Sequence, residues 1–255
     1  MKDMKKTGVL ATAAQKARIF AIFVAMLYEL LERLTFDTAQ ALLTKEGEKE
    51  VKKRFMEHLN IEIDPWSTQK ANLERFWLTV FNYQINWSDY VLPEYSDRYS
   101  HLNIRPTGFT AEQIYAGIKN CTKFTFKKRT KYMDNIDKAL REAKAVQSRP
   151  TGNYAWADGG TAEPDQEHLN KSYDDSINAN LIFMGPVEYL LSCALYEFLT
   201  GKVYDIKGAT RLSVLDSGGY ALFGGWYGGD GSYLVWSDRG FRFDAFGPRV
   251  VVFTS

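Results

Sequence analysis

Residues 211–255 read RLSVLDSGGYALFGGWYGGDGSYLVWSDRGFRFDAFGPRVVVFTS, and their composition differs from that of the preceding chain. This tail contains no Lys, Glu, Gln, Met, Asn, His, Ile or Cys, and is rich in Gly, aromatic residues, Ser, Asp and Arg. Short apolar runs alternate with Gly-rich turns, which is typical of a small antiparallel sheet. The Gly pairs at 218–219, 224–225 and 228–229 precede no helical pattern, so turns explain them better than a phosphate-binding loop.

The residues just before the tail alternate between strand and helix patterns. A short strand is predicted at 153–156, followed by a polar segment with a helix beginning near residue 163. We expect the acidic residues of this segment, among them Asp174 and Asp175, to be solvated. A strong helix follows, with Pro186 at its first position and Gly201 at its C-terminal cap. We expect the first strand to pair with the last, at 249–253, if the two ends of this region meet.

The first 147 residues are predicted to be mainly helical. Apolar periodicity indicates helices at 12–34, 38–59 and 134–146, and Asp64 and Pro65 favour a further helix start. Thr110 and Gln113 have the spacing of a capping box. Residues 86–109 are interpreted as a packed connecting loop. The Pro- and Gly-containing segment 148–152 marks a boundary, which gives an α+β fold with a helical region at 1–147 and a second domain at 148–255.

Charge and hydropathy limit the classes of partner. The 255 residues carry a net charge of +1, so no general attraction to polyanions is implied. The basic segment 123–132 has interleaved aromatic residues, but Asp134 and Asp137 offset its charge, and no nucleic-acid partner is predicted. The apolar run at 19–31 is too short to span a membrane and precedes no cleavage site. We therefore expect cytoplasmic synthesis without a signal peptide.

The sequence lacks the common patterns of enzyme and metal sites. None of the three His residues has metal-ligand spacing with Cys, Asp or Glu. Cys121 and Cys193 fall in helical patterns and are interpreted as buried thiols. No phosphate loop or Gly-x-Ser-x-Gly motif is present. We expect a protein without catalytic residues, bound metal or cofactor.

Several quoted segments carry a family resemblance. They are TGNYAWADG at 151–159, the helix PVEYLLSCALYEFLTGKVYDIKG at 186–208, RLSVLDSGG at 211–219, FGGWYGG at 223–229, YLVWSDRG at 233–240 and FGPRVVVF at 246–253. In this order they resemble the C-type lectin-fold variable proteins of diversity-generating retroelements, above all those of archaeal viruses and uncultivated microbes. The segment ADGGTAEPDQE matches the family's acidic run only in its later part.

The resemblance implies a C-type lectin-like ligand-binding domain with a small antiparallel sheet, two helices and a variable region at about 214–245. In such systems an error-prone reverse transcriptase randomises positions at template adenines, and Asn codons then never become Lys, Glu, Gln, Met or Trp. Trp226, Trp236 and Arg249 are assigned to a fixed framework, and we expect Arg249 to pair with a buried acid or carbonyl. The variable face is assigned to Asp216, Ser217, Tyr220, Phe223, Gly225, Tyr227, Asp230, Tyr233, Val235, Ser237, Asp238, Phe241, Arg242, Phe243 and Asp244.

Tyr, Ser, Gly and Asp suit an adaptable binding surface, and the tail has too many aromatic residues for one small sheet to bury. The expected partner is a protein or a cell-surface ligand. The helical region would mount the domain on a virion, a complex or another subunit. Two alternatives remain open: an enzyme of the formylglycine-generating type, and a fixed viral structural or carbohydrate-binding module. Calcium-dependent sugar binding is not expected, because Glu163-Pro164-Asp165 precedes the helices and lacks the partner motif.

Overall fold

The computed structural model describes residues 44, 64–121, 133–227 and 231–254. The chain divides into two compact units, Met1–Ile63 and Asp64–Ser255. Two of the predicted helices, at 12–34 and 38–59, lie outside the described residues apart from residue 44. The basic segment 123–132 also lies outside them. The division lies at residue 63 and not at residue 147, so the segment 64–147 belongs to the same unit as the tail.

A three-stranded antiparallel sheet joins distant parts of this unit. Its strands are β1 (His101–Arg105), β3 (Tyr154–Asp158) and β8 (Val252–Phe253), in the order β1-β3-β8. Trp156 lies opposite Phe253, so the predicted pairing of first and last strands is confirmed. The interpretation of 86–109 as a loop throughout is wrong, because β1 pairs with β3 over five residues.

The second sheet contains most of the tail. It comprises β2 (Lys144–Ala145), β4 (Ala209–Leu215), β5 (Ala221–Tyr227) and β6 (Gly231–Ser237) in the order β2-β4-β5-β6. A further strand, β7 (Phe246–Pro248), pairs with β4 in parallel. The tail therefore folds back on β4 after leaving the β5–β6 hairpin, and the sheet is not purely antiparallel.

The central helix α8 (Pro186–Thr200) begins and ends as predicted. Glu188 Oε2 accepts a 2.9 Å hydrogen bond from the Gly185 N–H, and Gly201 ends the helix with φ 69°. This left-handed conformation favours Gly. Most of α8 is buried, in agreement with its apolar sequence around the whole circumference.

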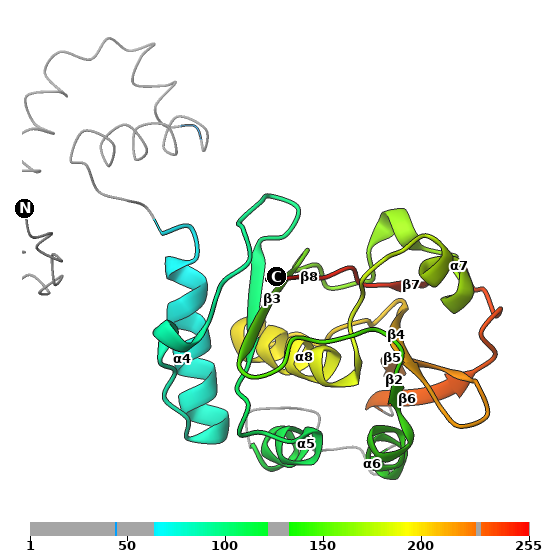
Figure 1. Cartoon of the computed structure of the whole chain (residues 1–255), viewed down its shortest axis with the longest axis horizontal. Coiled ribbons are helices and arrows are strands. Elements are labelled where there is room, and N and C mark those ends of the chain that lie inside the picture. The colour runs from blue at the N-terminus through cyan, green and yellow to red at the C-terminus, as the bar shows by residue number, and fades with distance from the viewer. Residues whose placement is uncertain (1–43, 45–63, 122–132, 228–230, 255) are drawn as a thin grey trace, which may run out of the picture. The chain divides into compact units, whose positions relative to one another are not determined.

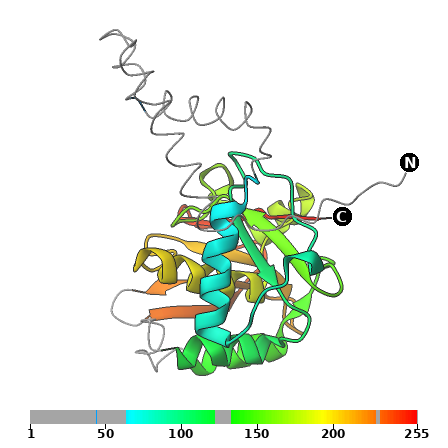
Figure 2. The ribbon, with the colours of Figure 1, turned by 90° about the vertical axis from the view of Figure 1, so that its left-hand side faces the viewer.

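Three other helices pack around this core: α4 (Ser67–Phe81), α5 (Ala111–Asn120) and α6 (Met133–Glu142). Helix α4 contacts β1 and α8, as seen in Figures 1 and 2, α5 contacts α8, and α6 contacts α5 and β6 of the second sheet. Leu73, Phe76 and Trp77 of α4 are fully buried in the same core cluster as the residues of α8. The core is thus continuous across residue 147, which explains why 64–255 forms one unit. None of the described helices is long and apolar enough to cross a membrane.

Helix ends are predicted where the capping residues are explicit. The Thr110–Gln113 capping box at α5 is confirmed. At α4 the Asp64 carboxylate accepts the Trp66 N–H, and the helix begins two residues later than Pro65. The helix expected at 134–146 ends at Glu142, because Lys144 and Ala145 pair with β4. In place of a helix near residue 163, a short 3-10 turn η3 (Gln166–His168) precedes α7 (Tyr173–Asn178); η1 (Trp87–Asp89) is a similar turn.

Candidate functional site

The hairpin of β5 and β6 has two faces of different character. Residues directly opposite each other in an antiparallel pair point to the same side, and successive residues alternate. The inner face, toward α8, is formed by the pairs Leu222–Trp236, Gly224–Leu234 and Trp226–Ser232. The outer face is formed by the pairs Ala221–Ser237, Phe223–Val235 and Gly225–Tyr233. The two predicted framework tryptophans therefore share one face, and most of the predicted variable residues of this hairpin share the other.

The inner face is closely packed on α8. A Cβ atom at Gly224 would lie 2.8 Å from Cζ of Tyr189 and 2.9 Å from Cδ2 of Leu234, too close for any side chain without a shift of the core. Gly225 is also buried, and a Cβ atom there would lie 2.7 Å from the Tyr233 hydroxyl. The assignment of Gly225 to an exposed face is therefore wrong, since the Tyr233 side chain covers it.

An aromatic cluster covers part of the outer face. We define it by five side chains: Phe223, Tyr233, Phe241, Phe243 and Phe246. The ring of Phe246 is at its centre, with centroids 5.0 Å from those of Phe223 and Phe243 and 6.1 Å from that of Phe241. Phe241 is 43% exposed and Phe243 is 54% exposed. Adjacent exposed aromatic side chains of this kind are typical of an interaction surface.

The exposed aromatic residues belong to a loop that ion pairs hold to α7. We call residues 238–244 the display loop. Arg239 donates two hydrogen bonds to Asp174 Oδ1, of 2.8 and 2.6 Å. Arg242 binds both oxygens of Asp175, at 2.8 and 2.7 Å. Such bidentate pairs fix orientation as well as distance. Asp174 and Asp175 remain partly exposed, with 41% and 28% of their side chains accessible, as predicted, but both also bind the loop.

A third arginine holds the display loop from below. Arg211 of β4 is fully buried, donating through Nε to the Lys171 carbonyl at 2.6 Å and through Nη2 to the Phe241 carbonyl. Its guanidinium carbon lies 5.9 Å from the ring centre of Phe241 and 6.0 Å from that of Phe246. Burial lowers the pKa of Arg211 to about 10, so the group stays charged at neutral pH. The loop is therefore preorganised by three cations.

Asp175 connects the display loop to the first turn of α7. Besides Arg242, it accepts the Ser172 N–H at 2.8 Å, which completes a capping box. The hydrogen bonds from Arg242, and then those from Ser172, hold the pKa of Asp175 well below its usual value. Because the folded-state pKa is depressed, the stabilisation is present above the unfolded pKa near 3.9 and is lost as the pH falls through the folded-state value.

We expect Asp175→Asn to lower the melting temperature by about 1–2 °C at pH 7, a small effect because the ion pair is exposed to solvent. Asn keeps the capping geometry and removes the charge. The difference from the wild-type chain should persist at pH 5 and shrink below about pH 4. Thermal melts by circular dichroism at pH 7, 5 and 3 measure it. A difference that stayed constant over this range would contradict the role of the Asp175 charge.

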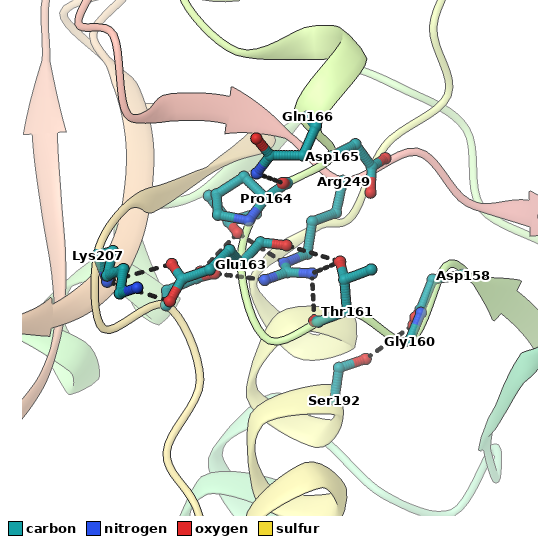
Figure 3. A network of polar contacts seen from close by, with 12 residues as sticks. Asp158, Gly160, Thr161, Glu163, Pro164, Asp165, Gln166, Ser192, Lys207 and Arg249 are labelled. Carbon is teal, nitrogen blue, oxygen red and sulfur yellow. Dashed lines mark hydrogen bonds and ion pairs between the residues drawn. The ribbon is translucent and has the colours of Figure 1, made fainter.

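The framework side of the tail centres on Arg249. This residue is 1% exposed and forms an ion pair with the fully buried Asp205. It also donates to Thr210 Oγ1 at 2.9 Å and to the Thr161 carbonyl at 2.8 Å, and Figure 3 shows its guanidinium directed at Thr161. Burial by itself lowers the pKa of Arg249, but Asp205, Tyr204 and Asp158 together outweigh this effect and the net shift of the pKa is upward. The expected pairing with a buried acid is thus present.

The segment 158–165 fastens the first sheet to this framework. The buried Asp158 accepts the Gly160 N–H at 2.7 Å and the Ser192 hydroxyl at 3.4 Å, as seen in Figure 3. Asp165 accepts the Val250 N–H at 2.7 Å, and burial raises the pKa of Asp165. The expectation that Asp165 is solvated is therefore wrong. Glu163 is half-buried and accepts the Lys207 N–H.

Beside this segment lies an open pocket with a volume of about 410 Å³. It is lined by Asp97, Arg98, Tyr99, Gly159, Thr161, Asp165, Gln166 and Glu167. Arg98 and Glu167 pair with each other, and Asp165 already accepts the Val250 N–H. Over residues 64–121, 133–227 and 231–254, no group of three or more His, Cys, Asp or Glu side chains is arranged to hold a metal ion. Several polar groups of the pocket lining therefore already have partners within the protein.

The predicted variable residues fall into four groups. The exposed ones are Ser217, Tyr220, Asp238, Phe241, Arg242, Phe243 and Asp244. The half-buried ones are Asp216, Phe223, Tyr233, Val235 and Ser237. Gly225 is buried, and Asp230 and the side chain of Tyr227 lie outside the described residues. Since Ala221 pairs with Ser237, the turn at 216–220 and the start of the display loop are neighbours.

Two groups of residues important for the site were not predicted. Asp174 and Asp175 hold the display loop, and Arg211 lies beneath it. The partners of these residues are distant in sequence. The only local signal is an arginine within an apolar strand, which predicted a buried role for Arg249 but was not applied to Arg211. The predicted framework tryptophans are half-buried; Trp236 packs against the core cluster.

Comparison of the chain with protein-family models, with curated proteins and with solved structures gives no match.

Proposed function

We propose that this protein is a non-enzymatic ligand-binding protein whose binding surface is the outer face of β5 and β6 together with the display loop. One observation carries the proposal: Phe241 and Phe243 are exposed on a loop that three arginines hold in place. Exposed aromatic groups supply large contact area, and a preorganised loop reduces the entropy lost on binding. An exposed turn with Tyr220, 51% exposed, adjoins this surface.

The proposal extends to the origin of the surface. The separation of Trp226 and Trp236 from the outer face is what a C-type lectin-like variable domain of a diversity-generating retroelement requires, because the exchangeable residues then do not support the core. In this proposal the ligand is a protein or cell-surface molecule, and the residues before the unit mount it on a virion or a larger complex. The strand pairing of β3 with β8, which brings the ends of the region together, supports the lectin-like assignment.

The alternative of a formylglycine-generating enzyme has no support in the site. Such chemistry needs reactive cysteine. Cys193 is 4% exposed on α8, and burial raises the pKa of its thiol well above the usual value, which disfavours the reactive thiolate.

Sequencing of the flanking DNA tests the proposed origin. We expect a near-copy of the segment that encodes residues 214–245, differing from it at adenines, and a nearby reverse transcriptase gene. Among related isolates, substitutions should concentrate at outer-face and display-loop positions and spare Trp226 and Trp236. An identical tail in all isolates, with no template copy, would instead favour a fixed structural or carbohydrate-binding module.

The two faces of the hairpin should differ in tolerance to substitution. We expect Tyr220→Ser and Phe241→Ser to change the free energy of unfolding by about 0.5 kcal/mol or less, as is usual for surface positions. Trp236→Ala should cost about 1–3 kcal/mol, below the value for a fully buried aromatic residue because its side chain is half-buried. Chemical denaturation of the three variants measures the difference. Equal losses in both groups would contradict the division into framework and display.

A further inference from the structure

Negatively charged side chains outnumber positively charged ones around the display loop. Arg239 and Arg242 are its two cations, and both are bound by carboxylates of α7. Asp238 and Asp244 of the same loop form no ion pair with any described residue. When Asp174 and Asp175 are counted, there are four carboxylates around these two guanidiniums. The excess is two negative charges. Asp216, in the adjoining turn, adds a third, and its Oδ1 accepts only backbone N–H groups.

The buried cation beneath the loop offsets one of these negative charges, since it interacts electrostatically with Asp175, but it is not accessible to a ligand. Arg211 is fully buried and its Nη2 and Nε donate to backbone carbonyls, so it offers no group to a ligand. Lys171 is exposed nearby in the chain and forms no ion pair with a described residue. Even with this lysine counted, the group remains negative. A partner that approaches the loop therefore meets carboxylates that have no counterion among the residues that the structure describes.

Along the loop, the exposed rings lie between two carboxylates that have no ion-pair partner among the described residues, although Asp238 Oδ1 accepts the Gly240 N–H at 2.7 Å. Phe241 and Phe243 are flanked by Asp238 on one side and Asp244 on the other. The face of an aromatic ring attracts a cation, and long cationic side chains place an apolar stem on such a ring while the charged end reaches a polar group. The combination matches a guanidinium or ammonium carried on an apolar stem. An acidic ligand would leave the carboxylates opposed by like charge.

Resting on the proposed function, we propose that the partner of this surface presents Arg or Lys side chains among apolar ones. The aromatic cluster receives the apolar part of the partner, and Asp238 and Asp244 receive the cations. Arg is favoured over Lys, because a planar guanidinium stacks on a ring and is more weakly hydrated. The display loop needs no rearrangement to bind, since α7 and Arg211 already hold it.

Three synthetic dodecapeptides test the proposal on the full chain. One alternates Arg with Leu, the second has Gln in place of Arg, and the third has Glu. Binding is measured by biolayer interferometry at 50 and 300 mM salt. We expect the Arg peptide to bind at least tenfold more tightly than the Gln peptide at low salt, and the Glu peptide to show no binding. The ratio of the affinities for the Arg and Gln peptides should be smaller at 300 mM salt, because salt screens exposed charges.

Variants assign the binding to the loop. Asp238→Asn with Asp244→Asn should remove most of the preference for Arg over Gln. Phe241→Ser and Phe243→Ser should each lower the affinity for the Arg peptide by roughly 3- to 10-fold. The matched control Lys171→Gln should bind the Arg peptide equally or more tightly. Circular dichroism melts confirm that every variant is folded.

Two results would overturn the charge inference: equal binding of the Arg and Gln peptides, or an Arg preference that survives the double Asp variant. If the neutral peptide binds and this binding depends on Phe241 and Phe243, the charge inference fails while the proposed binding surface stands. If the Arg peptide binds and neither Phe variant lowers its affinity, the charge inference and the proposed binding surface both fail. The comparison of isolates and flanking DNA tests the proposed function independently of any peptide.

Discussion

Asp205→Asn is expected to lower the free energy of unfolding by about 3–5 kcal/mol, the usual cost of removing one partner of a buried ion pair. Asp205 is fully buried, and its Oδ2 also accepts the Thr210 hydroxyl at 2.6 Å. The substitution leaves the Arg249 guanidinium charged in the core without its counterion. Asn suits the backbone, because residue 205 has φ 53° and Asn tolerates the left-handed region. Urea denaturation followed by tryptophan fluorescence measures the loss.

Two controls make this result specific. Asp174→Asn removes one partner of an exposed pair and should cost about 0–1 kcal/mol. The double variant Asp205→Asn with Arg249→Met should be less destabilised than the sum of its two single variants, since neither unpaired charge remains buried. If Asp205→Asn proved no more harmful than Asp174→Asn, the Arg249 network would not be a stabilising centre of the fold.

Trp156→Ala is the second large effect, with an expected loss of about 3–5 kcal/mol from the cavity that it leaves. Trp156 is fully buried on β3, opposite Asn103 of β1 on one side and Phe253 of β8 on the other. It therefore lies in the strand that pairs with two segments far from it in sequence, and its side chain is part of the core cluster. Because the core is continuous from α4 to β8, the whole unit 64–255 should lose stability in one transition. Circular dichroism and fluorescence should report the same midpoint.

Tyr220→Ala serves as the exposed control and should leave the midpoint nearly unchanged. Two separate transitions in the Trp156 variant would contradict a single cooperative unit. In that case the boundary expected at residues 147–148 would mark a real energetic division, with β1 and the helices around it melting apart from the tail.

Helix-capping residues in the sequence predicted where α8 and α5 begin and where α8 ends. Pro186 and Gly201 define both ends of α8, and Thr110 and Gln113 define the start of α5. The same reasoning placed β3 and the closing strand. These features involve neighbouring residues whose backbone requirements appear in the sequence itself.

Features that depend on long-range contacts were not predicted. The strand β1 is surrounded by Tyr, Ser, Pro and Asp, and its partner β3 lies about fifty residues later. The pairs Arg239–Asp174 and Arg242–Asp175 span 65 and 67 residues. No sequence pattern distinguishes these aspartates from solvated ones, because the fold alone brings the loop to α7. The sequence therefore predicted a candidate surface on the tail, but not the contacts with α7 that hold its loop in place.

The uninterrupted register of β5 and β6 has a consequence for heredity. The two strands pair residue for residue from Ala221 with Ser237 to Tyr227 with Gly231. Inserting or deleting a single residue within either strand would reverse its sides, turning a tryptophan outward and an outer-face residue into the core. Exposed outer-face residues can therefore be substituted without a change of register, while the number of residues in each strand must be inherited unchanged. Mutation by codon replacement respects that constraint, and mutation by insertion does not.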